Sequence, residues 1–158
     1  YNAPLEKIEV LIHPQSIVHS LVEYADNALI AQLSVPSMEI PIQLALTYPE
    51  REYAGVEPLD LTKQPLEFFK PDLKRYPCFS LALSAAKKGG IYPCAISAAN
   101  EEAVKLFLAD KIGFCDIEKY LENALNKATE MPVTLQNLIF TDYRARASVY
   151  ALFKENKN

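Results

Sequence analysis

In the first third of the chain, apolar and polar residues alternate in the pattern of β-strands. Residues 8–12 (IEVLI) place an apolar side chain at every second position, as in a strand with one face buried. Residues 21–24 and 28–33 form two further extended runs. Between these two runs, Asp26-Asn27 predicts a two-residue hairpin turn, because asparagine tolerates positive φ. This part of the chain is therefore expected to form a small sheet.

The spacing of apolar residues then changes to that of a short helix over residues 40–47. Ser37 is its expected N-cap, Pro41 falls in its first turns, and Pro49 ends it. Residues 50–77 contain five prolines or glycines among charged residues and predict a linker that crosses a surface. Its apolar residues are expected to dock into a groove: Leu66, Phe68 and Phe69.

The second half of the chain has the periodicity of amphipathic helices. The first covers residues 78–88 and ends at Gly89-Gly90, and Pro93 opens the second. The third begins at its N-cap Asp116, and the last begins at Thr134.

Two finer expectations concern charged residues on these helices. On the second helix, Glu101, Glu102 and Lys105 are expected to face solvent. In the last helical stretch, Asp142 is a candidate cap for a second segment.

These patterns predict an α+β fold. It consists of a small β-sheet piece with a short helix, a proline-rich linker, and an antiparallel helical bundle. The expected boundaries are residues 1–50, 51–77 and 78–158.

Composition limits the possible functions. The 158 residues are half apolar and carry a net charge of −4, with no basic stripe, so a nucleic-acid partner is not expected. No apolar run reaches the ~20 residues of a membrane span. The three cysteines, Cys78, Cys94 and Cys115, have no metal-ligand spacing. They favour buried thiols in a reduced compartment over a metal or redox role.

Residues that could carry chemistry are few. His13 follows an apolar run and precedes a proline, which suits a binding residue at a strand end or a histidine satisfied by a local carbonyl. His19 favours a structural role, and Met38 favours either core filling or the lining of a flat-ligand pocket. No cluster of acidic residues predicts a metal site. From these residues alone, the chain offers one edge of an active site.

Longer motifs carry a family resemblance. The ordered set HPQSIVHSLVEY, AQL, PSMEIPI, ALTYPER, YPCFSLALSAAKKGG and SAANEEAVKLFLADKIGFCDI is similar to 1-deoxy-D-xylulose 5-phosphate reductoisomerases. The resemblance covers nearly the whole chain. It implies the end of the catalytic domain within residues 1–50, the linker, and the C-terminal helical bundle. Together with a start at Tyr1 rather than methionine, it implies that a longer protein carries an NADPH domain and acidic metal ligands before this chain.

The same resemblance implies site residues and partners. His13 matches the active-site histidine of the HPQS motif, while Pro36 and Met38 match residues that pack near the nicotinamide ring. The three are expected to form one wall of a cleft. The implied parent is a cytoplasmic homodimer, paired through the sheet region, that uses NADPH and Mg²⁺ or Mn²⁺ on a sugar-phosphate substrate. No cofactor is expected on this chain alone.

The chain departs from the family at three positions. Ser37 and Glu39 replace the usual residues of a PDMR segment, and Asn27 stands where glycine is common. The competing hypothesis is a stand-alone helical oligomerisation or interaction module without catalysis. The reductoisomerase hypothesis predicts that this chain alone is inactive.

Overall fold

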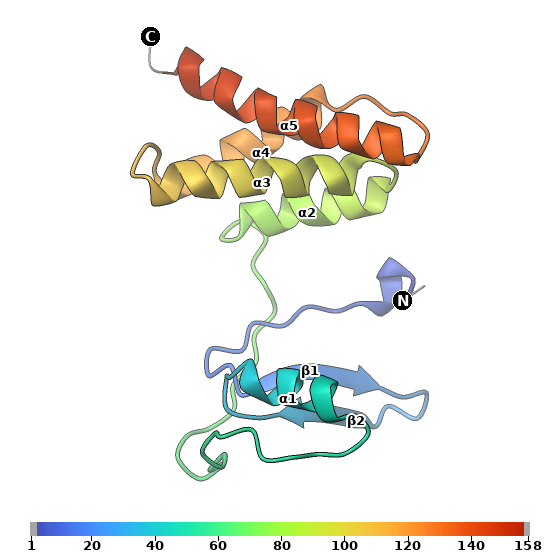
Figure 1. Cartoon of the computed structure of the whole chain (residues 1–158), viewed down its shortest axis with the longest axis vertical. Coiled ribbons are helices and arrows are strands. Elements are labelled where there is room, and N and C mark those ends of the chain that lie inside the picture. Colours follow the sequence, from blue (N-terminus) through green and yellow to red (C-terminus); the bar gives the residue numbers. More distant parts are fainter. Residues whose placement is uncertain (1–2, 157–158) are drawn as a thin grey trace. The chain divides into compact units, whose positions relative to one another are not determined.

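The chain divides into two compact units in the computed structural model, which describes residues 3–156 (Figure 1). The strand-bearing unit spans Val10–Pro71. The helical unit combines the segment ending at Glu9 with Asp72–Asn158. The start at Tyr1, which suggested a longer parent, lies outside the described residues. The three-part division into residues 1–50, 51–77 and 78–158 stays a prediction.

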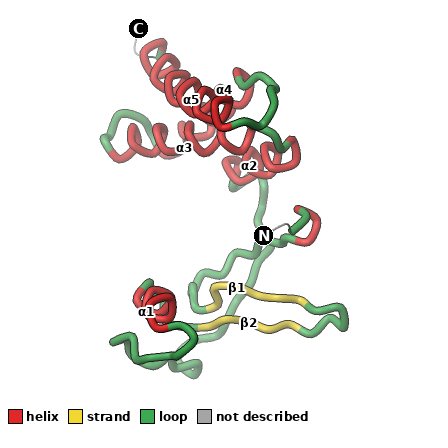
Figure 2. The backbone as a smooth tube through the Cα atoms, turned by 45° about the vertical axis from the view of Figure 1, so that its right-hand side comes forward, coloured by secondary structure: helices red, strands yellow, loops and turns green. Residues whose placement is uncertain are grey.

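The strand-bearing unit contains an antiparallel hairpin (Figure 2). β1 (Val18–Glu23) pairs with β2 (Leu29–Leu33), with Leu21 opposite Ala31. The register shifts between Val18 and Ser20, so His19 is the extra residue of a bulge. The two predicted strands are confirmed, although the first begins three residues earlier than expected.

The hairpin turn is one residue longer than predicted. Tyr24 and Ala28 close it through a backbone hydrogen bond of 2.9 Å, which leaves Ala25, Asp26 and Asn27 in the loop. Asn27 adopts a φ of 64°, as its tolerance of positive φ suggested. The Asp26 carboxylate accepts the Ala28 N–H at 3.0 Å, which stabilises the wider turn.

The strand predicted for residues 8–12 is wrong for this chain. Residues 8–11 form no regular strand, and only Ile12 pairs, in an isolated antiparallel bridge with Phe69. Ile8 and Val10 are exposed. A segment with an alternating pattern forms a strand only where a neighbouring strand completes its backbone hydrogen bonds. Among the described residues, no strand lies beside residues 8–11.

The short helix is α1 (Glu39–Thr47), as the apolar spacing predicted. Met38 occupies its N-cap position, one residue later than expected. The Ser37 hydroxyl still accepts the Glu39 N–H at 3.2 Å. Pro41 lies in the first turn, where a missing N–H does least damage.

The linker has the irregular backbone that its prolines predicted. Between the end of α1 and residue 76 it forms turns and the single bridge at Phe69. The expected docking of its apolar side chains into a groove is wrong, because Leu66, Phe68 and Phe69 are all exposed. Phe68 instead stacks against His13.

The helical unit is a bundle of amphipathic helices, and the predicted fold class is confirmed (Figure 1). Thr134 caps the last helix by accepting the Asn137 N–H at 3.2 Å. Gly89 ends the first helix with a φ of 66°. The α-helices of this unit in the described part of the chain are α2 (Pro77–Lys88), α3 (Tyr92–Leu108), α4 (Ile117–Lys127) and α5 (Leu135–Glu155), with short 3-10 turns η1 (Leu5–Lys7) and η2 (Phe114–Asp116).

The core of this unit lies among α3, α4 and α5. Small side chains on α3, such as Ala99 and Ala103, allow close approach of α4 and α5, which bring Leu121 and Val149 into the interior. No helix within residues 3–156 is both long and apolar enough to cross a membrane.

The expectations for Asp142 and for the cysteines are wrong. Asp142 caps no second segment, because α5 runs without interruption from Leu135 to Glu155. Cys115 is exposed, while Cys78 and Cys94 are half-buried. Burial raises the pKa of the Cys78 and Cys94 thiols, which keeps them protonated and unreactive.

Candidate functional site

An open pocket in the strand-bearing unit gathers residues from β1, β2 and the start of α1. Pro36 and Met38 line it from the turn that precedes α1, where the Ser37 N–H donates to the Val35 carbonyl at 2.8 Å. The pocket is therefore built on short-range structure. Its lining consists of His19, Gln32, Ser34, Pro36, Ser37, Met38, Ile40, Pro41, Leu44 and Arg51.

Met38 contributes exposed apolar surface to this pocket. Met38 is 71% exposed and occupies the N-cap position of α1. Pro36 and Pro41 add rigid apolar surface, and Ile40 and Leu44 extend it along one side of α1. An exposed thioether beside two prolines provides a flat, polarizable wall for an aromatic ring. Core filling, the competing interpretation of Met38, does not fit this exposure.

His19 joins this wall, although the sequence favoured a structural role for it. It is the bulge residue of β1, and its Nε2 lies 3.4 Å from the Ser34 hydroxyl. Gln32 donates to the same hydroxyl at 3.4 Å. These three side chains form a polar edge beside the apolar wall. The bulge, which depends on pairing with β2, has no marker in the sequence near His19.

His13 occupies a different position and does not line the pocket. Its Nδ1 lies 2.7 Å from the Glu67 carbonyl, and its ring stacks on Phe68 with centroids 4.6 Å apart. Because a carbonyl can only accept, Nδ1 carries the proton and Nε2 is left as an acceptor. Nε2 is buried and has no hydrogen-bond partner among the described residues. The structure therefore brings Pro36 and Met38 together and keeps His13 apart from them.

Neighbouring contacts clamp the His13 segment to the linker. Ile12 and Phe69 exchange backbone hydrogen bonds of 2.8 and 2.9 Å. The Gln15 side chain donates to the Glu67 carboxylate at 2.8 Å and accepts the Glu67 N–H at 3.2 Å. We call these contacts, with the His13–Phe68 stack, the linker clamp. A local carbonyl satisfies one nitrogen of His13, which was the alternative to a binding role.

The described residues form no cluster of metal-ligating side chains. Within residues 3–156, no three histidine, cysteine, aspartate or glutamate side chains lie close enough to hold a metal ion together. A divalent cation such as Mg²⁺ needs several oxygen ligands that converge on one point.

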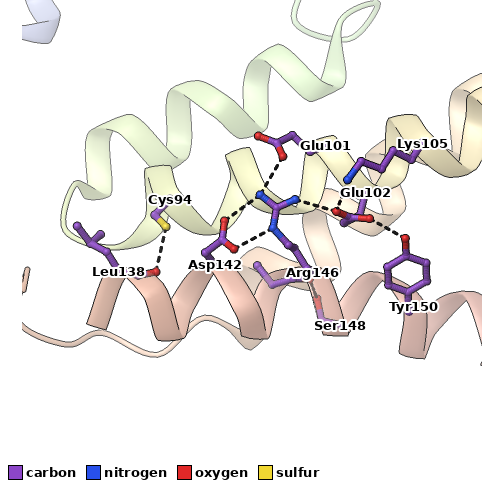
Figure 3. A network of polar contacts seen from close by, with 10 residues as sticks. Cys94, Glu101, Glu102, Lys105, Leu138, Asp142, Arg146, Ser148 and Tyr150 are labelled. Carbon is purple, nitrogen blue, oxygen red and sulfur yellow. Dashed lines mark hydrogen bonds and ion pairs between the residues drawn. The ribbon is translucent and has the colours of Figure 1, made fainter. Parts of the chain in front are cut away.

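A second cluster of charged side chains connects α3 to α5 in the helical unit (Figure 3). The Arg146 guanidinium forms ion pairs with Glu101, Glu102 and Asp142 at 2.7 to 2.8 Å. Glu102 also accepts from the Tyr150 hydroxyl at 2.6 Å and from the Lys105 ammonium at 2.8 Å. We call this cluster the Arg146 network.

The Arg146 network corrects the sequence prediction for Glu102. Glu102 does not face solvent; it is 5% exposed. Hydrogen bonds from Lys105 and Tyr150, opposed by burial and supported by Arg146, lower the pKa of Glu102 to about 2. Hydrogen bonds to Asp142, Glu102 and Glu101 raise the pKa of Arg146, and the bond from Arg146 lowers the pKa of Asp142. The bond to Glu102 raises the pKa of Tyr150. Each of these groups has a partner, so the network is suited to structural support rather than proton transfer.

Comparison with known proteins places these observations in a family. Residues 33–148 match the family model described as the DXP reductoisomerase C-terminal domain. The chain is 48% identical over 157 residues to the 1-deoxy-D-xylulose 5-phosphate reductoisomerase of Cupriavidus pinatubonensis and 46% identical to that of Aeromonas salmonicida. Each alignment includes 98% of this chain but only 40% of the length of the relative.

Solved structures agree. The chain resembles the reductoisomerase from Zymomonas mobilis in complex with NADPH, with a TM-score of 0.85 and 42% identity. The match covers 96% of this chain and 40% of that one. It also resembles a DOX-P reductoisomerase in complex with NADPH, fosmidomycin and magnesium, with a TM-score of 0.88 and 38% identity over 97% of this chain and 40% of the other.

Proposed function

The chain belongs to the 1-deoxy-D-xylulose 5-phosphate reductoisomerase family, and from this membership we propose that it forms the C-terminal part of such an enzyme. The complete enzyme converts 1-deoxy-D-xylulose 5-phosphate to 2-C-methyl-D-erythritol 4-phosphate in non-mevalonate isoprenoid biosynthesis, with NADPH and Mg²⁺ or Mn²⁺. The observation that carries the proposal is the apolar wall of Pro36 and Met38 in one pocket.

The pocket suits a nicotinamide ring. The ring is flat and weakly polar, and Pro36, Met38 and Ile40 offer apolar surface to one of its faces. When bound, NADPH supplies the hydride for the reduction step. The role of this chain is to orient the ring and to exclude water from one side of it. The hydroxyl of Ser34, held by His19 and Gln32, gives the ring's carboxamide a hydrogen-bonding partner.

The metal is handled differently. The described residues do not provide a set of ligands, so we propose that Mg²⁺ or Mn²⁺ is held outside this chain. The catalytic role of His13 also stays a proposal. Its buried Nε2 is an acceptor without a partner in the described residues, and it is the atom that a donor from substrate or from another part of the enzyme would meet. This supports a role in holding such a donor.

We further propose that the enzyme is a cytoplasmic homodimer that pairs through the sheet region. The exposed apolar residues of the hairpin, Leu29 and Ile30 among them, support an interface there, because two strands leave both sheet edges unpaired. The free thiols of Cys78, Cys94 and Cys115 are consistent with a reduced compartment.

A chimera tests the proposed function. The portion of the Zymomonas mobilis enzyme that precedes the matched region is joined to this 158-residue chain, and substrate-dependent NADPH oxidation is measured with Mg²⁺. We expect turnover by the chimera and none by the chain alone. A chimera that folds and binds NADPH but shows no turnover would reject the proposal.

Two substitutions in the chimera test the proposed roles of Met38 and His13. Met38→Ala should raise KM for NADPH, because it removes the exposed thioether from the pocket. Met131→Ala, which changes the other methionine of the chain in the helical unit, is the matched control and should leave KM unchanged. His13→Gln should lower kcat, and an unchanged kcat would remove the catalytic role of His13.

The competing function is a stand-alone oligomerisation module. The exposed hairpin supports this function, because an unpaired sheet edge can pair with another chain. The two functions differ in the chimera assay, since a module without catalysis gives self-association by light scattering but no turnover.

A further inference from the structure

Arg51 is the feature of the pocket that the proposed function does not yet use. Among the described residues that line the pocket, it is the only one with a permanent charge. Its guanidinium forms no ion pair with any described residue, although two glutamates flank it in sequence. Arg146, by contrast, pairs with three carboxylates. An unpaired guanidinium at the edge of an apolar pocket is available to a ligand.

The backbone that leads to Arg51 is held firmly. The Glu50 N–H donates to the Thr47 carbonyl at 2.9 Å. The Thr47 hydroxyl lies 3.0 Å from the Gln43 carbonyl and 2.9 Å from the Glu50 carbonyl, and donates to one or the other. These bonds fix the turn after α1 directly before Arg51. The backbone position from which the Arg51 side chain extends is therefore well defined.

The acid at the start of the pocket's helix is engaged elsewhere. Glu39 opens α1, beside the pocket, and its carboxylate accepts the Ser37 hydroxyl at 3.1 Å. Glu39 does not line the pocket. The described pocket thus combines an apolar wall, a polar edge at Ser34 and one uncompensated positive charge, which matches a ligand with a flat ring and an anionic group.

From this combination, we propose that Arg51 is a specificity-determining residue that binds a phosphate group of the molecule occupying the pocket. The guanidinium donates two parallel N–H bonds, which suits a phosphate better than the single-point charge of lysine. The inference rests on the proposed function, under which two sources of phosphate exist. One is the diphosphate of the dinucleotide, and the other is the phosphate of the sugar substrate.

Kinetics of the chimera separate these sources. Arg51→Gln should raise one KM about tenfold, as expected for loss of a charge-assisted hydrogen bond, with kcat changed less than about twofold. A rise in KM for NADPH assigns Arg51 to the dinucleotide, and a rise in KM for the sugar phosphate assigns it to the substrate. Arg51→Lys should recover only part of the affinity. Arg75→Gln, an exposed arginine of the helical unit, is the matched control and should change neither KM. Unchanged KM values for both substrates in Arg51→Gln would overturn the proposal.

A binding measurement keeps the inference independent of turnover. Inorganic pyrophosphate is titrated into the ¹³C,¹⁵N-labelled 158-residue chain, and the Nε–H signal of Arg51 and the methyl signal of Met38 are followed by NMR. We expect this signal to shift with saturation and the Met38 methyl signal to respond, with both effects lost in Arg51→Gln. A chimera without turnover together with this shift would reject the proposed function and retain the anion site. No shift at Arg51 would overturn the anion site whatever the chimera does.

Discussion

The two units of this chain bury their apolar residues to very different extents. In the helical unit, residues from α2 to α5 form a closed core in which Ala99, Ala103 and Val149 are completely inaccessible. In the strand-bearing unit, Ile17 is the only buried residue among those described, while hairpin residues such as Leu29 and Ile30 are exposed. The helical unit therefore has a closed core of its own, whereas the strand-bearing unit leaves most of its apolar side chains exposed.

The largest stability effect is expected from the helical core. Leu121→Ala should lower the free energy of unfolding by about 2–5 kcal/mol, because it leaves a cavity at a residue that is 2% exposed. Urea denaturation followed by circular dichroism measures the change. Leu108→Ala is the matched control, and its exposed side chain predicts a change within about 0.5 kcal/mol. Equal effects of the two variants would contradict a closed core.

The Arg146 network comes next. Arg146→Met should destabilise the helical unit by about 1.5–3 kcal/mol, because it removes charge-assisted hydrogen bonds to three carboxylates, while Lys105 and Tyr150 still bond the buried Glu102. Arg144→Met removes an exposed arginine that lies over Phe140, and should cost less than about 1 kcal/mol. If the Arg146 variant lost no more stability than the Arg144 variant, the network would not connect α3 to α5.

The same network predicts how stability depends on pH. The folded-state pKa of Glu102, about 2, lies below its ordinary value of 4.5. Its contribution is therefore complete above about pH 4.5 and is lost as pH falls toward 2. Glu102→Gln should reduce the loss of stability between pH 5 and pH 3, whereas Glu122→Gln at an exposed site should not. The midpoint of urea unfolding at each pH measures this, and identical pH profiles for wild type and Glu102→Gln would count against the network.

How much the sequence predicts depends on the range of the interactions involved. Thr134, Gly89 and Pro93 mark helix ends through their own backbone chemistry, and the observed helices begin or end within one residue of those positions. The apolar stripe of α4 needs only its 3.6-residue period, and Tyr120 and Leu121 are buried as it predicts.

Residues whose structure depends on distant partners were predicted poorly. Glu102 is buried because Arg146 and Tyr150, on another helix, neutralise and bond its carboxylate. His19 reaches the pocket through a bulge that depends on pairing with β2. For the candidate site, a family motif identified Pro36 and Met38, but no local pattern could add Arg51 or separate His13 from them.

The smallest stability effect is expected from the hairpin. Ile30→Thr should change the unfolding of the helical unit by less than about 0.5 kcal/mol, because Ile30 is exposed on β2. It should nevertheless weaken self-association measured by light scattering at high concentration, since it removes apolar surface from the proposed interface. Ile139→Thr, a similar change on the exposed face of α5, is the control and should leave self-association unchanged. Equal weakening by both would place the interface elsewhere.

Hydrogen exchange compares the two units directly, in the 158-residue chain alone and in the chimera with the Zymomonas mobilis sequence. In the chain alone, amides of α3 and α5 should exchange at least about a hundredfold more slowly than those of β1 and β2. In the chimera, β1 and β2 should gain protection while α3 and α5 stay as they were. Strand amides that are equally protected in the chain alone and in the chimera would show that the strand-bearing unit gains nothing from the Zymomonas mobilis sequence, which would contradict the account.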